Sequence, residues 1–176
     1  MTRALVLYHS LFGNTKDIAH SLARGIQETG IETDCMRTDE IDINKISEYD
    51  FLAIGGPTHN IGLSKSMKAF LHQLRPVNLR GMKGFSFDTR KPSRLNKKRW
   101  LILENSAAKR IEAGMKRMKI KIIKPRESAI VLGREGPLES KMNARFQNIG
   151  QNIGGILNRQ IRTKHSTLFS KSVETP

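Results

Sequence analysis

Apolar residues along the chain form short runs and helix-spaced stripes, and the two alternate. The runs at residues 4–8, 51–54 and 84–87 contain few polar side chains, as is typical of strands buried on both faces. Residues 31–37 alternate between apolar and polar and predict another short strand. The remaining strand pattern covers residues 120–123 and 128–132, which predict one strand interrupted at Pro125.

Four stretches repeat apolar residues at the three- and four-residue spacing of amphipathic helices. They cover residues 18–26, 63–74, 111–118 and 142–156. Gly30 is expected to end the first helix, while Ser64 and Ser106 are candidate N-caps of the second and third. Pro137 is expected at the start of the last helix.

Strands that alternate with helices predict a parallel sheet with helices on both faces, because each connection between parallel strands crosses over through a helix. At 176 residues, the chain has the length of one domain. In an open sheet of this kind, ligands bind at the carboxyl ends of the strands. The loops that follow the strands are therefore where functional residues are expected.

The loop at residues 9–15 follows the first predicted strand and leads into a helix. It lacks the glycine spacing of both the dinucleotide-binding and the nucleoside-triphosphate loops. Ser10 and Thr15 nevertheless supply hydroxyl donors, and Gly13 permits a tight turn beside the positive end of a helix. The loop therefore fits a phosphate held by neutral donors, although an ordinary turn with Asn14 or Thr15 as a helix cap would have the same composition.

A second polar loop, GGPTHNIG at residues 55–62, follows another buried strand. Its glycines and Pro57 favour a tight turn that presents Thr58, His59 and Asn60 at the end of the strand. A single histidine is weak evidence of acid–base catalysis, so no catalytic residue is assigned.

Together the two loops resemble those of a known family. SLFGNT at residues 10–15 resembles the Ser/Thr-x-Thr-Gly-Asn-Thr phosphate loop of flavodoxins, and residues 55–71 are similar to the flavin loop of flavodoxin domains, including those of flavodiiron proteins. KGFSFDTR at 83–90, NSAAKRIE at 105–112 and PRESAIVLGREGPLE at 125–139 extend the resemblance over most of the chain.

This resemblance implies an α/β, flavodoxin-like three-layer sandwich with a five-stranded parallel sheet in the order 2-1-3-4-5. It implies an FMN-binding domain at residues 1–160, followed by a polar, flexible tail at 161–176. The family's pattern also implies which residues contact FMN. They are Ser10, Leu11, Phe12, Gly13, Asn14 and Thr15 around the phosphate, Pro57, Thr58, His59, Asn60 and Gly62 along the flavin ring, and Asp88, Thr89 and Arg90 on its other side.

The sequence departs from the family pattern beside the ring. Flavodoxins commonly enclose the flavin between aromatic side chains, but the loop at 55–62 has none, and Trp100 is the one aromatic residue in the loop that follows Arg90. Phe12 could lie near the ring, or it could pack against the protein.

The charge of the chain is the other departure, because members of this family are typically acidic. The net charge is +15, and it is unevenly distributed: residues 1–60 carry −4 and residues 61–176 carry +19, with six basic residues between Arg90 and Arg99. Such asymmetry is expected of a protein with an anionic partner, although a basic surface that simply faces solvent would show it too. An acidic redox protein is the expected partner, and nucleic acid is the alternative, although no nucleic-acid motif supports it.

The expected function is therefore that of an FMN-binding electron-transfer protein. The first alternative is an FMN-dependent oxidoreductase that acts on a quinone, NAD(P)H or an anionic substrate, and the second is a basic binding module without flavin. Cys35 is the single cysteine, which excludes an internal disulfide and favours a cytoplasmic location. No apolar run is long enough to span a membrane, and no His/Cys cluster has the spacing of a metal site.

Overall fold

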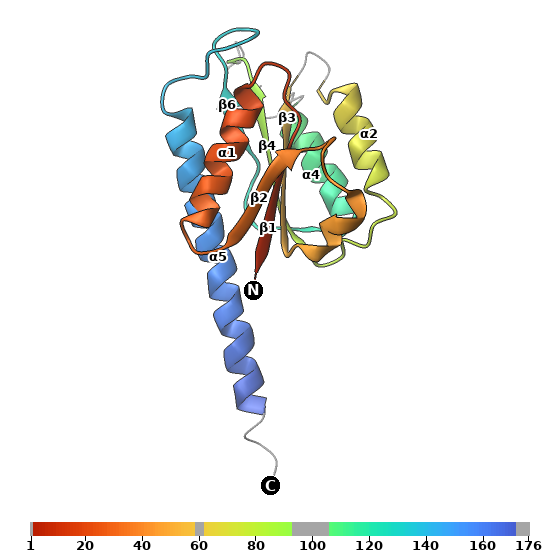
Figure 1. The fold of residues 1–176 in the computed structure, drawn as a ribbon, viewed down its shortest axis with the longest axis vertical. Helices are drawn as coiled ribbons and strands as arrows, with labels where there is room; N and C mark the ends of the chain where they lie inside the picture. Colours follow the sequence, from red (N-terminus) through yellow and green to blue (C-terminus); the bar gives the residue numbers. More distant parts are fainter. Residues whose placement is uncertain (1, 59–61, 93–105, 172–176) are drawn as a thin grey trace.

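The computed structural model is a three-layer α/β sandwich in which a twisted parallel sheet separates two pairs of helices (Figure 1). It describes residues 2–58, 62–92 and 106–171, with side chains described up to residue 160. His59, Asn60 and Trp100, and most of the basic run at 90–99, lie outside the described residues.

The sheet has the strand order β2-β1-β3-β4-β5, as expected for a flavodoxin-like fold, and a sixth strand, β6, also pairs with β4. The strands are β1 (Arg3–Tyr8), β2 (Glu32–Arg37), β3 (Phe51–Pro57), β4 (Lys83–Arg90), β5 (Lys121–Ile122) and β6 (Glu127–Ile130). β5 pairs with the start of β4 and β6 with its end, both in parallel. The predicted interruption at Pro125 is therefore confirmed, because two short strands pair with different parts of β4. Counting them separately raises the number of strands in the sheet from five to six.

The helices begin at the carboxyl ends of the strands that precede them, so their N-termini lie at one edge of the sheet (Figure 1). They are α1 (Asn14–Gln27), α2 (Lys65–Gln73), α4 (Ala107–Arg117) and α5 (Met142–Lys171), and a short 3-10 helix, η1 (Ile43–Glu48), precedes β3. We call this edge, where the strands end and these helices begin, the carboxyl edge. η1 was not predicted, because six residues without a complete apolar stripe give no periodic signal.

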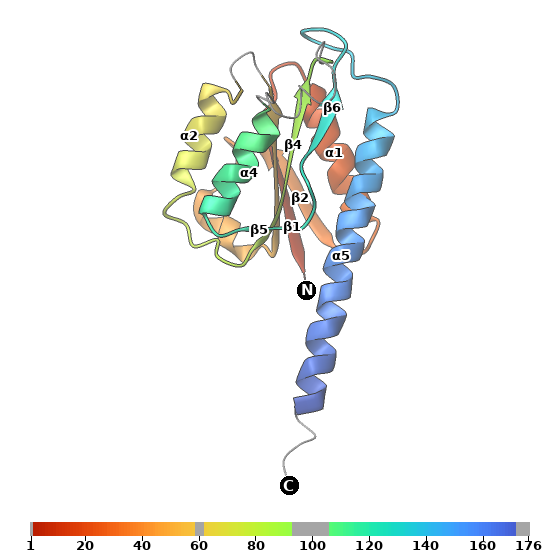
Figure 2. The ribbon, with the colours of Figure 1, turned by 180° about the vertical axis from the view of Figure 1, so that it is seen from behind.

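Two hydrophobic cores lie on opposite faces of the sheet. α1 and α5 cover one face and α2 and α4 the other, as Figure 2 shows from behind. Alternate residues of the central strands point to opposite faces, so Val6 enters the α1–α5 core while Leu5 and Leu7 enter the α2–α4 core. This two-sided burial explains why these strands are apolar throughout.

α1 and α5 pack closely enough for their backbones to touch. A Cβ atom added at Gly25 would lie 2.0 Å from the Gln147 carbonyl oxygen, and one at Gly150 would lie 2.2 Å from the Leu22 carbonyl oxygen. Both carboxylate oxygens of Glu28 accept hydrogen bonds from α5, one from Gln147 (2.6 Å) and one from Gln151 (2.7 Å). The glycines thus allow the contact that fixes α1 in place.

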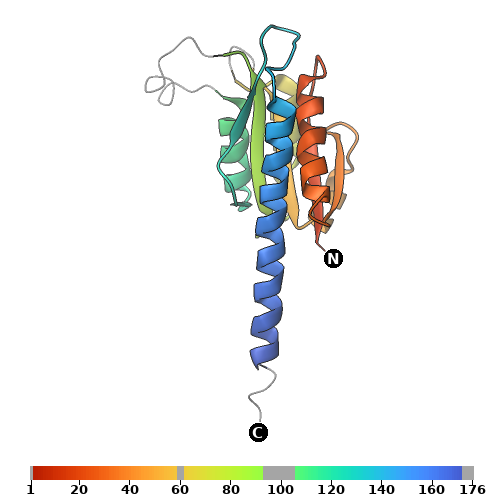
Figure 3. The same ribbon diagram turned by 90° about the vertical axis from the view of Figure 1, so that its left-hand side faces the viewer.

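α5 begins five residues after Pro137, later than the sequence predicts, and runs well past the end of the sheet (Figure 3). Its backbone is helical to Lys171, beyond the domain boundary expected at residue 160. The flexible tail at 161–176 stays a prediction.

Candidate functional site

The loop between β1 and α1 makes a tight turn at the carboxyl edge. Gly13 has a φ of 87°, a left-handed conformation that disfavours side chains. Its N–H donates a hydrogen bond to the largely buried Ser10 hydroxyl over 3.1 Å, which closes the turn. α1 starts directly after it, as predicted, but the N-cap is Gly13 rather than Asn14 or Thr15.

The N-terminus of α1 differs from those of α2 and α4 in its capping. Ser64 and Ser106 cap α2 and α4 by accepting hydrogen bonds from the N–H groups of Met67 (3.1 Å) and Lys109 (3.2 Å), as the sequence predicts. No side chain caps α1. The first-turn N–H groups of a helix have no partner within the helix, so α1 presents donors and the positive end of its dipole to the carboxyl edge.

Two buried hydroxyl groups connect this loop to β4. The Oγ1 atoms of Thr15 and Thr89 lie 2.7 Å apart, and both side chains are almost fully buried. One hydroxyl donates to the other, so the accepting hydroxyl retains a proton that it can donate elsewhere. The sequence assigned both residues to the site, and the structure brings them together although they are 74 positions apart.

The fully buried carboxylate of Asp88 joins three elements at the end of β4. Its Oδ2 accepts hydrogen bonds from the hydroxyl groups of Thr58 (2.6 Å) and Ser106 (2.7 Å) and from the Ala108 N–H (3.2 Å). The Thr58 hydroxyl in turn accepts from the Ala107 N–H (2.8 Å). Asp88 therefore ties the loop after β3 to the start of α4, and its Oδ1 has no hydrogen-bond partner among the described residues.

The other predicted site residues lie around these two groups. Pro57 ends β3 beside Thr89, and Gly62 resumes the described chain with a φ of 91°. Arg90 is the last residue of β4, opposite Ile130. The Asn14 side-chain amide donates to the Glu135 carbonyl oxygen over 2.9 Å and so holds the loop after β6 against the start of α1.

Leu11 and Phe12 lie in the site loop, but their side chains point outward. They are 57% and 47% exposed, so about half of each side chain faces solvent. Ser106 was predicted as a helix cap and not as a site residue. Its hydrogen bond to Asp88 spans 18 positions, and no local sequence pattern reports a contact of that range.

Cys35 lies on β2, half-buried against the α1–α5 core. Burial raises the pKa of its thiol to about 12, so the group stays protonated and unreactive at neutral pH. Among the described residues, no three His, Cys, Asp or Glu side chains form a group that could hold a metal ion. Within that same part of the chain, no helix is both long enough and apolar enough to cross a membrane.

Comparisons with known proteins agree with this architecture. The chain is 32% identical to "Probable flavodoxin 1" of Bacillus subtilis (strain 168) over 88 residues, which are 49% of this chain and 56% of that protein. It is 28% identical over 102 residues to an NAD(P)H dehydrogenase (quinone) of Cupriavidus metallidurans, covering 47% of this chain and 51% of that one. The chain spans about half the length of these two curated relatives.

Solved structures extend the similarity of fold to nearly the whole chain. A flavodoxin from the domain Archaea superposes with a TM-score of 0.72 at 19% identity and covers 89% of this chain and 99% of its own. The rubredoxin:oxygen oxidoreductase of Desulfovibrio gigas gives 0.73 at 16% identity, over 90% of this chain and 37% of its own. The family model described as Flavodoxin matches residues 6–95, and the chain therefore belongs to the flavodoxin family, whose cofactor is FMN.

Proposed function

We propose that this protein binds FMN at the carboxyl edge and transfers electrons to or from a partner protein. The uncapped N-terminus of α1 is the observation that carries this proposal. It lies behind the Gly13 turn and beside the Thr15–Thr89 hydroxyl pair. These groups supply neutral hydrogen-bond donors and the positive end of a helix dipole, which together suit a phosphate monoester.

The residues around the turn fit a phosphate group sterically. The space where a Cβ atom of Gly13 would lie contains no atom within 4 Å, so the backbone there is open to a ligand. Ser10 is held toward the turn by its hydrogen bond from Gly13. We infer that residues 10–15 hold the phosphate, mainly through backbone N–H groups and the hydroxyl of Thr15, while the side chains of Leu11 and Phe12 face outward.

The flavin ring would lie between the loop after β3 and the end of β4. Pro57, Thr58 and Gly62 belong to that loop, and Asp88, Thr89 and Arg90 end β4. His59 and Asn60 complete the proposed set. The hydrogen bond from Thr58 to Asp88 would hold the loop in the position that the ring requires.

When bound, FMN supplies the redox chemistry. The task of the chain is then to hold the phosphate, to orient the ring at the carboxyl edge and to present it to a partner. Redox carriers of this family act through partner proteins, and the positive charge of residues 61–176 favours an acidic partner, because charge complementarity raises the rate of encounter. For this role, the lone cysteine favours the cytoplasm.

A second candidate function is an FMN-dependent oxidoreductase that acts on a quinone, on NAD(P)H or on another anionic substrate. The similarity to an NAD(P)H dehydrogenase (quinone) favours it. Oxidation of NADH or NADPH by the FMN-loaded protein in the presence of menadione would identify an enzyme. Absence of turnover, with FMN bound, would favour the carrier.

The test of FMN binding is the visible spectrum of the purified protein, followed by identification of the flavin that is released on denaturation. Affinity is then measured by quenching of FMN fluorescence in Thr15→Val, with Thr33→Val as the matched control. Thr33 lies on β2 and is also buried, but its hydroxyl donates to the carbonyl oxygen of Ile31, just before that strand and away from the loop. We expect Thr15→Val alone to weaken FMN binding, by about tenfold for one lost hydrogen bond to a charged group.

Two results would contradict the proposal. One is a colourless protein that does not quench FMN, which would leave a basic binding module on a flavodoxin frame. The other is equal FMN affinity in the two threonine variants, which would place the phosphate elsewhere.

A further inference from the structure

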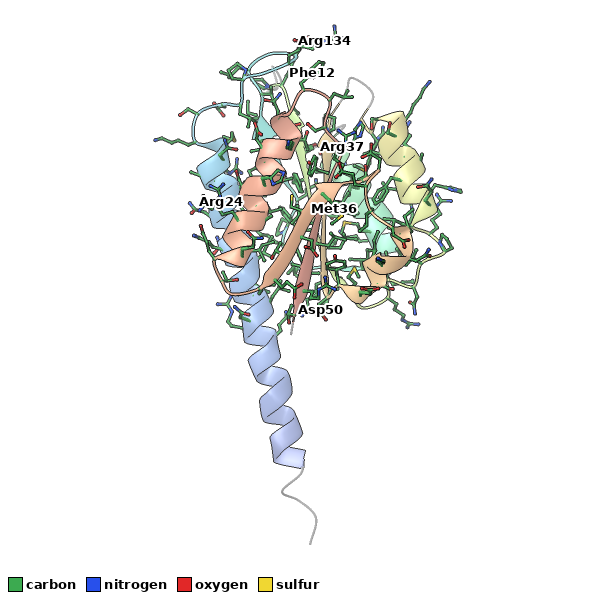
Figure 4. The ribbon with its side chains drawn as sticks, viewed as in Figure 1. Phe12, Arg24, Met36, Arg37, Asp50 and Arg134 are labelled. Atoms are coloured by element: carbon green, nitrogen blue, oxygen red, sulfur yellow. The ribbon has the colours of Figure 1, made fainter. Side chains whose placement is uncertain are left out.

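The large hydrophobic side chains that are exposed in the described part of the chain gather at the carboxyl edge. They are Leu11 (57% exposed), Phe12 (47%) and Leu132 (58%). Leu11 and Phe12 follow β1, and Leu132 follows β6. Figure 4 shows Phe12 and Arg134 at this edge, in the loops after β1 and β6.

The two loops that carry these side chains are held together. The Asn14 side chain donates to the Glu135 carbonyl oxygen over 2.9 Å, and the loop after β6 is closed by the Leu132 N–H, which donates to the Pro137 carbonyl oxygen over 2.9 Å. The apolar side chains are therefore presented by two connected loops. Exposed apolar side chains that gather at one place indicate an interaction site.

Basic residues at the same edge occupy positions that the helices themselves disfavour. Lys65 is the first residue of α2 and Lys109 lies in the first turn of α4, and both are exposed. Cations at a helix N-terminus oppose the helix dipole. Neither first turn contains an acidic residue that would offset them, and Lys91, also exposed, follows β4 nearby. Helix stability therefore does not explain this placement.

The α2–α4 side of the molecule has no exposed acidic residue among residues 62–92 and 106–126. These segments contain 15 lysines and arginines and two acidic residues, Asp88 and Glu112. Both acidic side chains are buried, and the Glu112 carboxylate is also paired with Lys116 and Arg126. The exposed acidic residues of this face lie in η1 and the turn before it, at Asp39, Glu40, Asp42 and Glu48. An acidic partner would therefore meet the least repulsion over α2 and α4, away from η1.

We propose that the carboxyl edge is the docking surface for an acidic redox protein. Leu11, Phe12 and Leu132 form its apolar centre, and Lys65, Lys91 and Lys109 form a basic rim on its α2–α4 side. Protein interfaces combine an apolar centre with a polar rim, whereas a nucleic-acid backbone is bound through cations and needs no apolar centre. The inference rests on the proposed function, because the same edge holds the proposed FMN site and docking there would bring the partner's redox centre close to it.

The experiment measures the affinity for a plant-type [2Fe–2S] ferredoxin, as the acidic probe, by isothermal titration calorimetry at low salt. A basic cytochrome c and a mixed-sequence DNA duplex are titrated alongside. Both the FMN-loaded and the FMN-free protein are used, so that docking is measured whether or not FMN binds. The rate of electron transfer from reduced ferredoxin is then measured by stopped flow on the FMN-loaded protein.

The test variant is Lys65→Glu/Lys109→Glu and the matched control is Arg80→Glu/Lys121→Glu. The control changes the net charge equally on the same side, but at the opposite edge, since Lys121 pairs with the first residue of β4 and Arg80 precedes that strand. Glutamate suits a helix N-terminus, so the test variant is not expected to lose stability. We expect it to bind ferredoxin about tenfold more weakly and the control to change less than threefold. Leu132→Ser, at an exposed position outside the proposed phosphate loop, should weaken docking while FMN stays bound.

Four outcomes would overturn the proposal. Equal losses in the two charge variants would assign the effect to net charge alone, and equal binding of ferredoxin and cytochrome c would remove the charge selectivity. Tighter binding of the DNA duplex than of ferredoxin would assign the basic side to nucleic acid. Unchanged docking in Leu132→Ser would remove the apolar side chains from the interface. Failure of the protein to bind FMN is a separate result, because it would leave the ferredoxin titration of the FMN-free protein interpretable.

Discussion

The close contact between α1 and α5 at Gly150 predicts opposite effects for two alanine substitutions in the same helix. A Cβ atom at Gly150 would lie 2.2 Å from the Leu22 carbonyl oxygen and 2.9 Å from the Ile26 nitrogen, both of which belong to the backbone of α1. Backbone atoms cannot rotate away. Gly150→Ala must therefore push the two helices apart. At Gly155, in contrast, a Cβ atom would meet nothing within 4 Å.

The size of the effect follows from the required displacement. A carbon–oxygen contact of about 3.3 Å is ordinary, so α5 must move away by about 1 Å. A gap of that size forfeits about a quarter to a half of each dispersion contact between the packed side chains, and overpacking costs about 1–3 kcal/mol. Alanine recovers about 1 kcal/mol through its higher helix propensity. We expect Gly150→Ala to lower the free energy of unfolding by up to about 2 kcal/mol and Gly155→Ala to raise it by up to about 1 kcal/mol.

The assay is urea unfolding followed by circular dichroism, with thermal unfolding as a second measurement. In a domain of this size, each kcal/mol corresponds to a shift of about 2–4 °C in Tm. The hydrogen bonds from Gln147 and Gln151 to Glu28 should weaken along with the packing. If Gly150→Ala were as stable as Gly155→Ala, the close contact between the two helices would be refuted.

Three further predictions concern single residues. Gly13→Ala should lower stability by about 1–2 kcal/mol through its φ of 87° alone and should weaken FMN binding in a fluorescence titration; unchanged affinity would exclude this turn from the site. Ser106→Ala loses both a helix cap and a hydrogen bond to buried Asp88, so urea unfolding should show a free energy of unfolding lower by about 2–3 kcal/mol. Ser64→Ala loses a cap alone and should lower it by about 1 kcal/mol. Equal losses in the two variants would mean that the hydrogen bond to Asp88 contributes nothing to stability. Burial raises the pKa of Cys35 to about 12, so the thiol of the unfolded chain loses its proton at lower pH than the thiol of the folded protein. The free energy of unfolding should therefore fall by about 1–2 kcal/mol between pH 8 and 10.5, and fall less in Cys35→Ala. Identical pH profiles of the two proteins would contradict this.

The fold could be predicted because its signals are local. Buried strands such as β1 and β3 are apolar throughout, and Ser64 and Ser106 precede helical stripes at the spacing that a cap requires. The turn at Gly13 could also be placed, because the glycine and the start of α1 are adjacent in sequence. In each case the interacting groups lie within a few residues of one another.

The parts of the site that escaped prediction depend on contacts between distant residues. Asp88 was expected beside the flavin, but no pattern indicates that one of its oxygens accepts from Thr58 and Ser106, which lie 30 and 18 positions away. The exposure of Phe12 is equally invisible in sequence, because an aromatic residue in a loop can pack inward or face solvent. The length of α5 was missed because the predicted apolar stripe at residues 142–156 ends well before the helix does at Lys171.

The outermost position of the sheet beside β4 is divided between two short strands, β5 and β6, and this division bears on how the protein avoids self-association. A long, unpaired edge strand can pair with the edge of another molecule and start aggregation. Here that edge consists of a two-residue strand and a four-residue strand with Pro125 between them, and proline cannot donate a backbone hydrogen bond. A second molecule could therefore form few consecutive hydrogen bonds along it. The same interruption that hid the sixth strand in the sequence thus makes this edge a poor template for aggregation.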